Sequence, residues 1–339
     1  MKKKLFMMAI FLLLLAIAVG GYAYYVICTP NTQKVSSVLW IPQEASFQQV
    51  VDSLKAHDMI KNEKNFRLVA KLMKYERVKP GKYKLEGNSS NYELVRMLRK
   101  GQHHPVKFTF NNVRTKNQLI EKIGNRFFFE PKELESLIND PRFLESYGLT
   151  TENVMTVFIP DSYEIFYDVT ARDFFEKMYA SYQRFWTDNR KSLAQKMGLT
   201  PIEVAILASI VEEENYRESE KAIIAGLYLN RLNIGMKLQA DPTVKFAVGD
   251  FSLKRILLKH TEIDSPYNTY LYQGLPPGPI RIPERSTLDS VLHYTHHDYL
   301  YMCAKEDLSG AHNFAKSPSQ HAANAAKYHR AINKLKIRK

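Results

Sequence analysis

The sequence has little cysteine, and few of its excess positive charges lie in the body of the chain. Its two cysteines, Cys28 and Cys303, lie far apart in 339 residues, so they cannot form the disulfide framework of a small secreted domain. The formal net charge is +13, but Lys2–Lys4 and the six basic residues of 327–339 carry most of it. Residues 5–326 hold 39 basic and 35 acidic side chains. This near balance argues against a nucleic-acid-binding protein, which carries a basic patch over a folded face.

A long uncharged segment lies near the start of the sequence. Residues 5–27 hold no charged side chain, and a helix of that length spans roughly 34 Å, enough for the hydrocarbon core of a bilayer. The segment is longer than the apolar core of a signal peptide, and no Ala-x-Ala cleavage site follows closely. We therefore expect a retained single-pass anchor in the cytoplasmic membrane. The positive-inside rule places Lys2–Lys4 in the cytoplasm and the rest of the chain outside it, in the periplasmic or extracytoplasmic space.

Capping boxes mark the starts of four helices. In the pattern S/T-x-x-E/Q the two side chains satisfy each other's backbone groups at a helix start. The pairs are Ser46 with Gln49, Ser90 with Glu93, Thr115 with Gln118, and Thr200 with Glu203. Short apolar segments at 37–41, 81–85 and 105–110 precede the first three and predict strands. Short strands alternating with helices indicate an α+β protein with a small N-terminal unit.

The helix predicted from Pro201 ends in three consecutive carboxylates. Residues 204–211 are apolar or small on every side, which predicts a buried helix, and Glu212–Glu214 follow directly. Burial and the negative end of the helix dipole both raise the pKa of a carboxyl there, as a proton donor requires. The small side chains of the stripe leading to Glu212 predict that this residue faces a cleft, with Glu214 supporting it. The alternative is a solvated acidic helix end.

Later segments contain the polar and aromatic side chains that are typical of sugar-binding clefts. Gln239 and Asp241 come first, the segment 267–270 contains two tyrosines and an asparagine, and residues 274–279 are rich in Gly and Pro. A loop so dense in Gly and Pro has a well-defined backbone shape. Taken singly, each of these signals is weak.

Together these segments resemble a known family. The run from Ala208 to Glu214 is followed by Asn-Arg-Leu at 230–232, Ile-Gly-Met at 234–236, Asp-Pro-Thr-Val at 241–244, Tyr-Asn-Thr-Tyr at 267–270, Gly-Leu-Pro-Pro-Gly-Pro-Ile at 274–280 and Gly-Ala-His-Asn-Phe at 310–314. In this order they closely resemble the YceG-like family of endolytic murein transglycosylases. The resemblance covers nearly the whole chain, including the membrane anchor and an N-terminal LysM-like subdomain.

The resemblance implies a site and a reaction. It implies that Glu212 is catalytic, and that Glu214, Gln239, Asp241, Thr243, Tyr267 and Asn268 contribute to the substrate cleft. Protonated Glu212 would donate to the oxygen between N-acetylmuramic acid (MurNAc) and N-acetylglucosamine (GlcNAc). It would then take the proton of the MurNAc C6 hydroxyl, which closes a 1,6-anhydro ring. Such a reaction needs one carboxylate and neither a metal nor a cofactor. The implied partners are peptidoglycan strands, the membrane and the peptidoglycan synthases.

The expected organisation follows the chain from its N-terminus. We predict a cytoplasmic tail at 1–4, a transmembrane helix at 5–27, a LysM-like region at 35–130, a mainly helical α+β catalytic domain at 131–326 and a basic tail at 327–339. Three alternatives remain open. His293, His296, His297 and Asp298 could hold zinc, the chain could be a non-catalytic peptidoglycan-binding scaffold, or it could be a hydrolytic muramidase with Glu214 or Asp241 as second carboxylate.

Overall fold

The chain folds as a mainly helical α+β protein with small two-stranded sheets. A computed structural model describes residues 2–215, 217–253 and 255–337, so Met1, Arg338 and Lys339 of the two predicted tails lie outside the described residues. The chain forms two compact units. The first contains Met1–Phe108, Asn125–Glu130 and Tyr163–Thr170, and the second contains Thr109–Gly124, Pro131–Ser162 and Ala171–Lys339.

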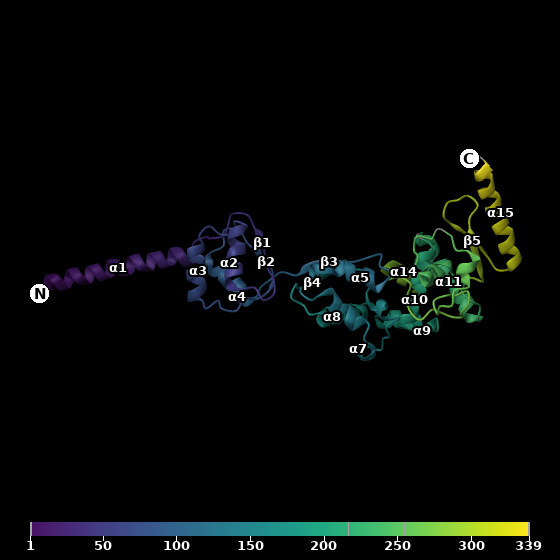
Figure 1. Cartoon of the computed structure of the whole chain (residues 1–339), viewed down its shortest axis with the longest axis horizontal. Coiled ribbons are helices and arrows are strands. Elements are labelled where there is room, and N and C mark those ends of the chain that lie inside the picture. Colours follow the sequence, from purple (N-terminus) through teal and green to yellow (C-terminus); the bar gives the residue numbers. More distant parts are fainter. Residues whose placement is uncertain (1, 216, 254, 338–339) are drawn as a thin grey trace. The chain divides into compact units, whose positions relative to one another are not determined.

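Helix α1 (Lys2–Cys28) contains the long uncharged segment near the N-terminus (Figure 1, purple). It is long and apolar enough to cross a membrane, and its apolar side chains from Leu5 to Val19 are exposed. Only its last turn joins the core of the first unit. There Val26 is buried, and its carbonyl accepts a hydrogen bond from the side chain of Asn91 at 2.8 Å. The helix is therefore tied to the first unit at its C-terminal end alone.

A two-stranded sheet and three helices build the core of the first unit. The order is β1 (Ser37–Ile41), α2 (Phe47–Ala56), α3 (Glu63–Leu72), β2 (Gly81–Leu85) and α4 (Asn91–Lys100). Strands β1 and β2 pair antiparallel, from Ser37 opposite Leu85 to Ile41 opposite Gly81. Both strands have the predicted bounds. The capping boxes at Ser46 and Ser90 form as predicted, and they start α2 and α4.

The next elements along the chain alternate between the two units. They are β3 (Val106–Thr109), α5 (Lys116–Ile123), α6 (Pro131–Ile138), α7 (Pro141–Glu145), β4 (Ser162–Ile165) and α8 (Ala171–Phe185), with 3-10 turns at Gly124–Arg126 and Val154–Val157. Strand β3 pairs with β4. The box at Thr115 is half formed, because the side chain of Gln118 accepts from the backbone of Arg114 instead. Residues 109–124 group with the second unit and residues 125–130 with the first.

The second unit is built around helix α10 (Pro201–Glu214). As predicted, it starts at a complete capping box on Thr200, and all residues from Val204 to Glu212 are buried. Helices α9 (Asp188–Lys196), α11 (Glu218–Asn233), α12 (Asp241–Val248) and α14 (Arg285–Leu292) pack against it. The remaining elements are α13 (Leu258–Thr261), the hairpin β5 (Tyr301–Ala304) and β6 (His312–Ala315), and α15 (Pro318–Ile337), which includes the described part of the basic tail.

Candidate active site

The three glutamates at the end of α10 point into different surroundings. Successive side chains on an α-helix are turned by about 100°, so Glu212 and Glu214 are separated by about 200° around the axis. They therefore lie on nearly opposite faces of the helix. The groups that surround the carboxyls differ between the two faces.

Glu212 and Glu213 face arginines. One oxygen of Glu212 lies 3.0 Å from a terminal nitrogen of Arg281, and the other accepts from the backbone N–H of Glu284 at 2.7 Å, at the start of α14. Glu213 accepts from the same arginine at 2.9 Å and from Arg114 at 2.8 and 3.1 Å. Glu212 and Arg281 are both buried. This cluster holds the segment after Pro279 and the segment before α5 against the end of α10.

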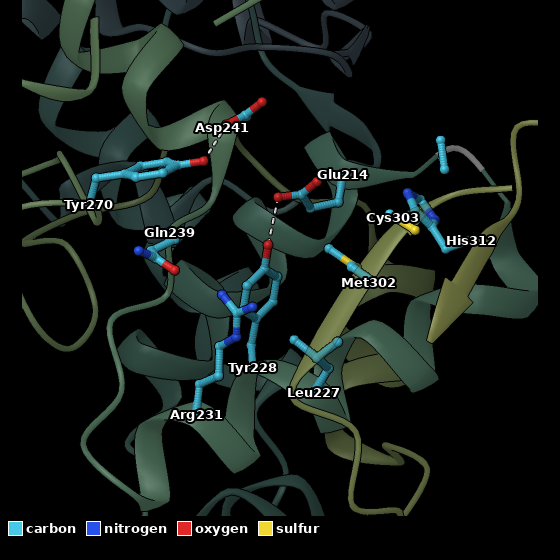
Figure 2. A pocket seen from close by; sticks show the side chains of 11 residues that line it. Glu214, Leu227, Tyr228, Arg231, Gln239, Asp241, Tyr270, Met302, Cys303 and His312 are labelled. Atoms are coloured by element: carbon cyan, nitrogen blue, oxygen red, sulfur yellow. Dashed lines mark hydrogen bonds between the residues drawn. The ribbon is translucent and has the colours of Figure 1, made fainter. Parts of the chain in front are cut away.

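Glu214 faces a pocket instead. The pocket has a volume of about 210 Å³ (Figure 2). Its lining residues are Glu214, Leu227, Tyr228, Arg231, Gln239, Asp241, Tyr270, Met302, Cys303, Ala304 and His312. The hydroxyl of Tyr228, a buried residue of α11, donates to Oε1 of Glu214 at 2.5 Å. Glu212 does not line this pocket, so the prediction that it faces the cleft is not matched here. On its own face Glu212 contacts the buried Arg281, and the sequence did not show this residue as its partner.

The surroundings of Glu214 raise the pKa of its carboxyl to about 7. Burial is the largest cause, and the negative charges of Asp241 and Glu213 act in the same direction. The hydrogen bond from Tyr228 and the positive charge of Arg231 oppose this shift. A carboxyl with this pKa is about half protonated at neutral pH, so it can donate a proton and then hold the charge that remains.

The wall across from Glu214 is formed by the start of α12 and the loop that packs on it. Gln239 has a left-handed backbone, with φ of 48°, and its N–H donates to the carbonyl of Thr269 at 3.1 Å. A non-glycine residue held in this conformation by its neighbours is a frequent feature of functional sites. Asp241 accepts from the hydroxyl of Tyr270 at 2.6 Å. The pocket therefore places a second carboxylate and a side-chain amide opposite the proton-holding carboxyl (Figure 2).

Of the predicted site residues, Glu214, Gln239 and Asp241 line the pocket and four others do not. Thr243 is fully buried, and its hydroxyl donates to the carbonyl of Ala240 at 2.7 Å. Asn268 is also buried, and it orients the pocket loop by accepting from the backbone N–H of Tyr270 at 3.0 Å. Tyr267 packs on Phe246, with ring centroids 4.7 Å apart. Glu212 lies in the arginine cluster. Thr243 and Asn268 thus shape the site from behind.

Sequence reasoning missed several lining residues. Tyr270 and His312 stand in the segments that carry the resemblance, so a signal was present. Arg231 also stands in such a segment. It is buried and donates to the backbone carbonyls of Leu300 and Leu238, which fixes the hairpin and the segment before Gln239. Tyr228 has no comparable signal, because a single aromatic residue on a buried helix face is expected to be a core residue.

The residues proposed for the zinc alternative are engaged in other contacts. Both ring nitrogens of His297 meet backbone groups, the carbonyl of Ile223 at 2.9 Å and the N–H of Tyr299 at 3.0 Å. Asp298 accepts from Lys316 at 2.7 Å. Within 2–215, 217–253 and 255–337, no group of three or more His, Cys, Asp or Glu side chains is arranged to hold a metal ion.

The chain is similar to known proteins over most of its length. Residues 39–327 match the YceG-like family. The chain is 28% identical to the endolytic murein transglycosylase of Bacillus subtilis, over 85% of this chain and 83% of that protein. It is 26% identical to the protein of the same name from Streptococcus pneumoniae, over 96% of this chain and 65% of the longer relative. A crystal structure of a YceG-like protein from Listeria monocytogenes superposes with a TM-score of 0.57 at 25% identity, covering 86% of this chain and 99% of that one. The match over most of its length, together with the shared fold, means that this chain belongs to the YceG-like family.

Proposed function

We propose that this protein is a membrane-anchored endolytic lytic transglycosylase. It would cleave the bond between MurNAc and GlcNAc in nascent peptidoglycan strands, leave 1,6-anhydroMurNAc ends and so terminate strand elongation. The observation that carries the proposal is the carboxyl of Glu214, whose pKa is raised to about 7 in a pocket lined by polar and aromatic side chains. The names of the relatives support the substrate class.

In the proposed reaction Glu214 takes the role that the resemblance gave to Glu212. Protonated Glu214 donates to the glycosidic oxygen as the bond to C1 of MurNAc breaks. The C6 hydroxyl of the same sugar attacks C1 as its proton passes to a basic side chain of the pocket, and because this nucleophile is tethered, no second protein carboxylate is needed. The polar groups of Gln239 and Asp241 lie where they can contact the sugar ring that becomes positively charged. Every step is a proton transfer or a bond exchange within the substrate, so the chain's own side chains suffice.

The rest of the chain supports a place at the wall-facing side of the cytoplasmic membrane. Helix α1 is long and apolar enough to be a single-pass anchor, and Lys2–Lys4 favour a cytoplasmic N-terminus. In the first unit, the order of β1, α2, α3 and β2 supports the LysM-like prediction. We propose that this unit binds glycan and that the protein works beside the peptidoglycan synthases.

The test is the chemistry of the new strand ends. Full-length protein in detergent is incubated with purified sacculi, and the soluble fragments are analysed by mass spectrometry. A transglycosylase yields anhydroMurNAc ends, which are lighter than reducing ends by one water. Heat-treated protein serves as the control for spontaneous cleavage. Reducing MurNAc ends alone would refute the transglycosylase assignment.

One observation favours a second candidate, a hydrolytic muramidase. Asp241 lines the same pocket as Glu214, and glycosidases that use water need two carboxyl groups. In that reaction Asp241 would activate a water or attack C1. The two candidates differ in one variant: Asp241→Asn would abolish cleavage by the hydrolase, whereas the transglycosylase would keep its anhydro product at a lower rate.

A further inference from the structure

A histidine on the hairpin shares the pocket with Glu214. His312 is the first residue of β6, where it pairs with Ala304 of β5. Figure 2 shows it on the same side of the pocket as Met302 and Cys303. Its side chain is 15% exposed. The sequence pattern assigned it no chemical role.

Glu220 of α11 fixes the orientation and the tautomer of this ring. One of its oxygens accepts from the backbone N–H of His312 at 3.0 Å, and the other lies 2.9 Å from the ring Nδ1. A carboxylate is an acceptor, so Nδ1 carries the ring proton and the neutral ring has its lone pair on Nε2. The side-chain amide nitrogen of Asn215 lies 3.3 Å from Nδ1, but it donates to Glu220 at 2.5 Å. Asn215 follows Glu214 directly in the sequence, and its side chain helps to hold the Glu220 carboxylate in place.

The second ring nitrogen, Nε2, is available to accept a hydrogen bond or a proton from a ligand. In the part of the chain that the structure describes, no protein group forms a hydrogen bond with Nε2 of His312. His297 in the same unit is different, because backbone groups engage both of its ring nitrogens. A histidine held by a carboxylate at one nitrogen and open to a pocket at the other has the arrangement of a general base.

We propose that Nε2 of His312 takes the proton of the attacking C6 hydroxyl and that Glu220 is its positioning residue. The proposal rests on the proposed transglycosylase function. As Glu214 protonates the leaving oxygen and the C1–O bond breaks, O6 bonds to C1 and its proton moves to Nε2. The imidazolium then returns this proton through solvent to the Glu214 carboxylate. The cycle consumes no water and leaves both residues as they began. Acid and base are thus two residues, and Glu214 need not serve as both.

The first test combines removal of the ring with its chemical replacement. Full-length His312→Ala in detergent is expected to form anhydroMurNAc ends with a kcat lowered by about 10²–10⁴-fold, with little change in KM. Added imidazole is expected to restore part of the rate, because the vacated space admits it. Two controls accompany the variant. His296→Ala removes an exposed histidine outside the pocket and leaves kcat unchanged, and Glu214→Gln is not restored by imidazole.

A second variant guards against misfolding. His312→Asn keeps a donor near the position of Nδ1, so it preserves the contact with Glu220 but has no basic nitrogen in the pocket. It is expected to fold normally by circular dichroism and to lose as much activity as His312→Ala. Glu220→Gln, which leaves only one oxygen to serve both the ring and the backbone N–H, is expected to lower kcat by about tenfold or more.

The outcomes separate this proposal from the proposed function. If the wild-type protein forms no anhydro ends, the transglycosylase function itself fails. If the wild type forms them and either His312 variant keeps a kcat within threefold of it, the base assignment is overturned while the function stands. A loss confined to KM, or one that imidazole does not relieve in a folded His312→Ala protein, likewise overturns the assignment.

Discussion

The two faces of the end of α10 place neighbouring glutamates in two different environments. On one face, Glu212 and Glu213 meet two arginines and a backbone N–H. On the other, Glu214 meets a tyrosine hydroxyl and a pocket, and burial raises the pKa of its carboxyl to about 7. The residue type and the helix are the same, so position around the helix decides the role. The first face holds structure together and the second is available for chemistry.

The largest expected difference between the faces is in activity. Glu214→Gln should lower the rate of anhydroMurNAc formation by about 10²–10⁴-fold, because an amide cannot donate the proton. Glu212→Gln should keep most of the activity of the protein that remains folded, since Glu212 does not line the pocket. Both variants are assayed on sacculi after their thermal midpoints are checked. An inactive, folded Glu212→Gln beside an active Glu214→Gln would restore the assignment made from the sequence.

On the arginine face, where Glu212 and Glu213 contact arginines, substitutions should lower the stability of the fold. Arg281→Met leaves the carboxylates of Glu212 and Glu213 without this partner, and we expect the free energy of unfolding to fall by about 3–5 kcal/mol. The matched control is Arg285→Met, which breaks the exposed pair with Asp161 and should cost about 0–1 kcal/mol.

The unfolding measurement for these arginine variants can be restricted to the second unit. The chain has two tryptophans, and in a Trp40→Phe background the buried Trp186 reports on the second unit alone in urea. Equal losses from the two arginine variants would contradict the structural role of the cluster.

The substitution Glu214→Gln, which is expected to inactivate the protein, should also stabilise its fold at high pH. The folded-state pKa of Glu214 lies above the value of 4.5 for a free glutamate, so the folded protein prefers the protonated form. Ionisation of Glu214 therefore destabilises the folded wild-type protein. This destabilisation is absent below about pH 4.5, grows as the pH rises and is complete above about pH 7. Glu214→Gln should therefore raise the free energy of unfolding by about 3 kcal/mol at pH 8 and by little at pH 4.5. A variant that is less stable than wild type at pH 8 would contradict this.

The smallest expected effect is that of Tyr228→Phe on the pKa of Glu214. Tyr228 donates to Glu214 and so lowers its pKa. Activity that needs protonated Glu214 falls as the pH rises above about 7. In Tyr228→Phe this decline should move to higher pH by about half a unit to one unit, the equivalent of one lost hydrogen bond. The measurement is kcat against pH, and a shift to lower pH would show that the hydroxyl does not stabilise the charged carboxylate.

Local features of this chain were largely predictable from its sequence. The bounds of β1 and β2 and the capping boxes at Ser46, Ser90 and Thr200 follow from short-range patterns, and they are confirmed. The box at Thr115 formed only in part, because the side chain of Gln118 accepts from the backbone N–H of Arg114 and not from that of Thr115. Such competition between neighbouring donors is not visible in a residue pattern.

The site was predictable only where its residues lie close together in the sequence. Gln239 and Asp241, which the sequence predicted in the substrate cleft, both line the pocket, and they stand together at the start of one helix. The choice between Glu212 and Glu214 depends on Arg281 and Tyr228, which come from two other segments. The small-residue stripe before Glu212 was interpreted as room for a ligand, whereas in the structure Ser209 of that stripe accepts from the backbone of Ile280 at 3.0 Å. Packing of the neighbouring chain segment accounts for the small side chain.

A titration of the glutamate carboxyls tests the central comparison most directly. In protein labelled with ¹³C at glutamate side-chain carboxyls, we predict one resonance that titrates near pH 7. This resonance should disappear in Glu214→Gln and persist in Glu212→Gln. If it disappears in Glu212→Gln and persists in Glu214→Gln, the proton is held on the arginine face, and the roles assigned to the two faces are contradicted.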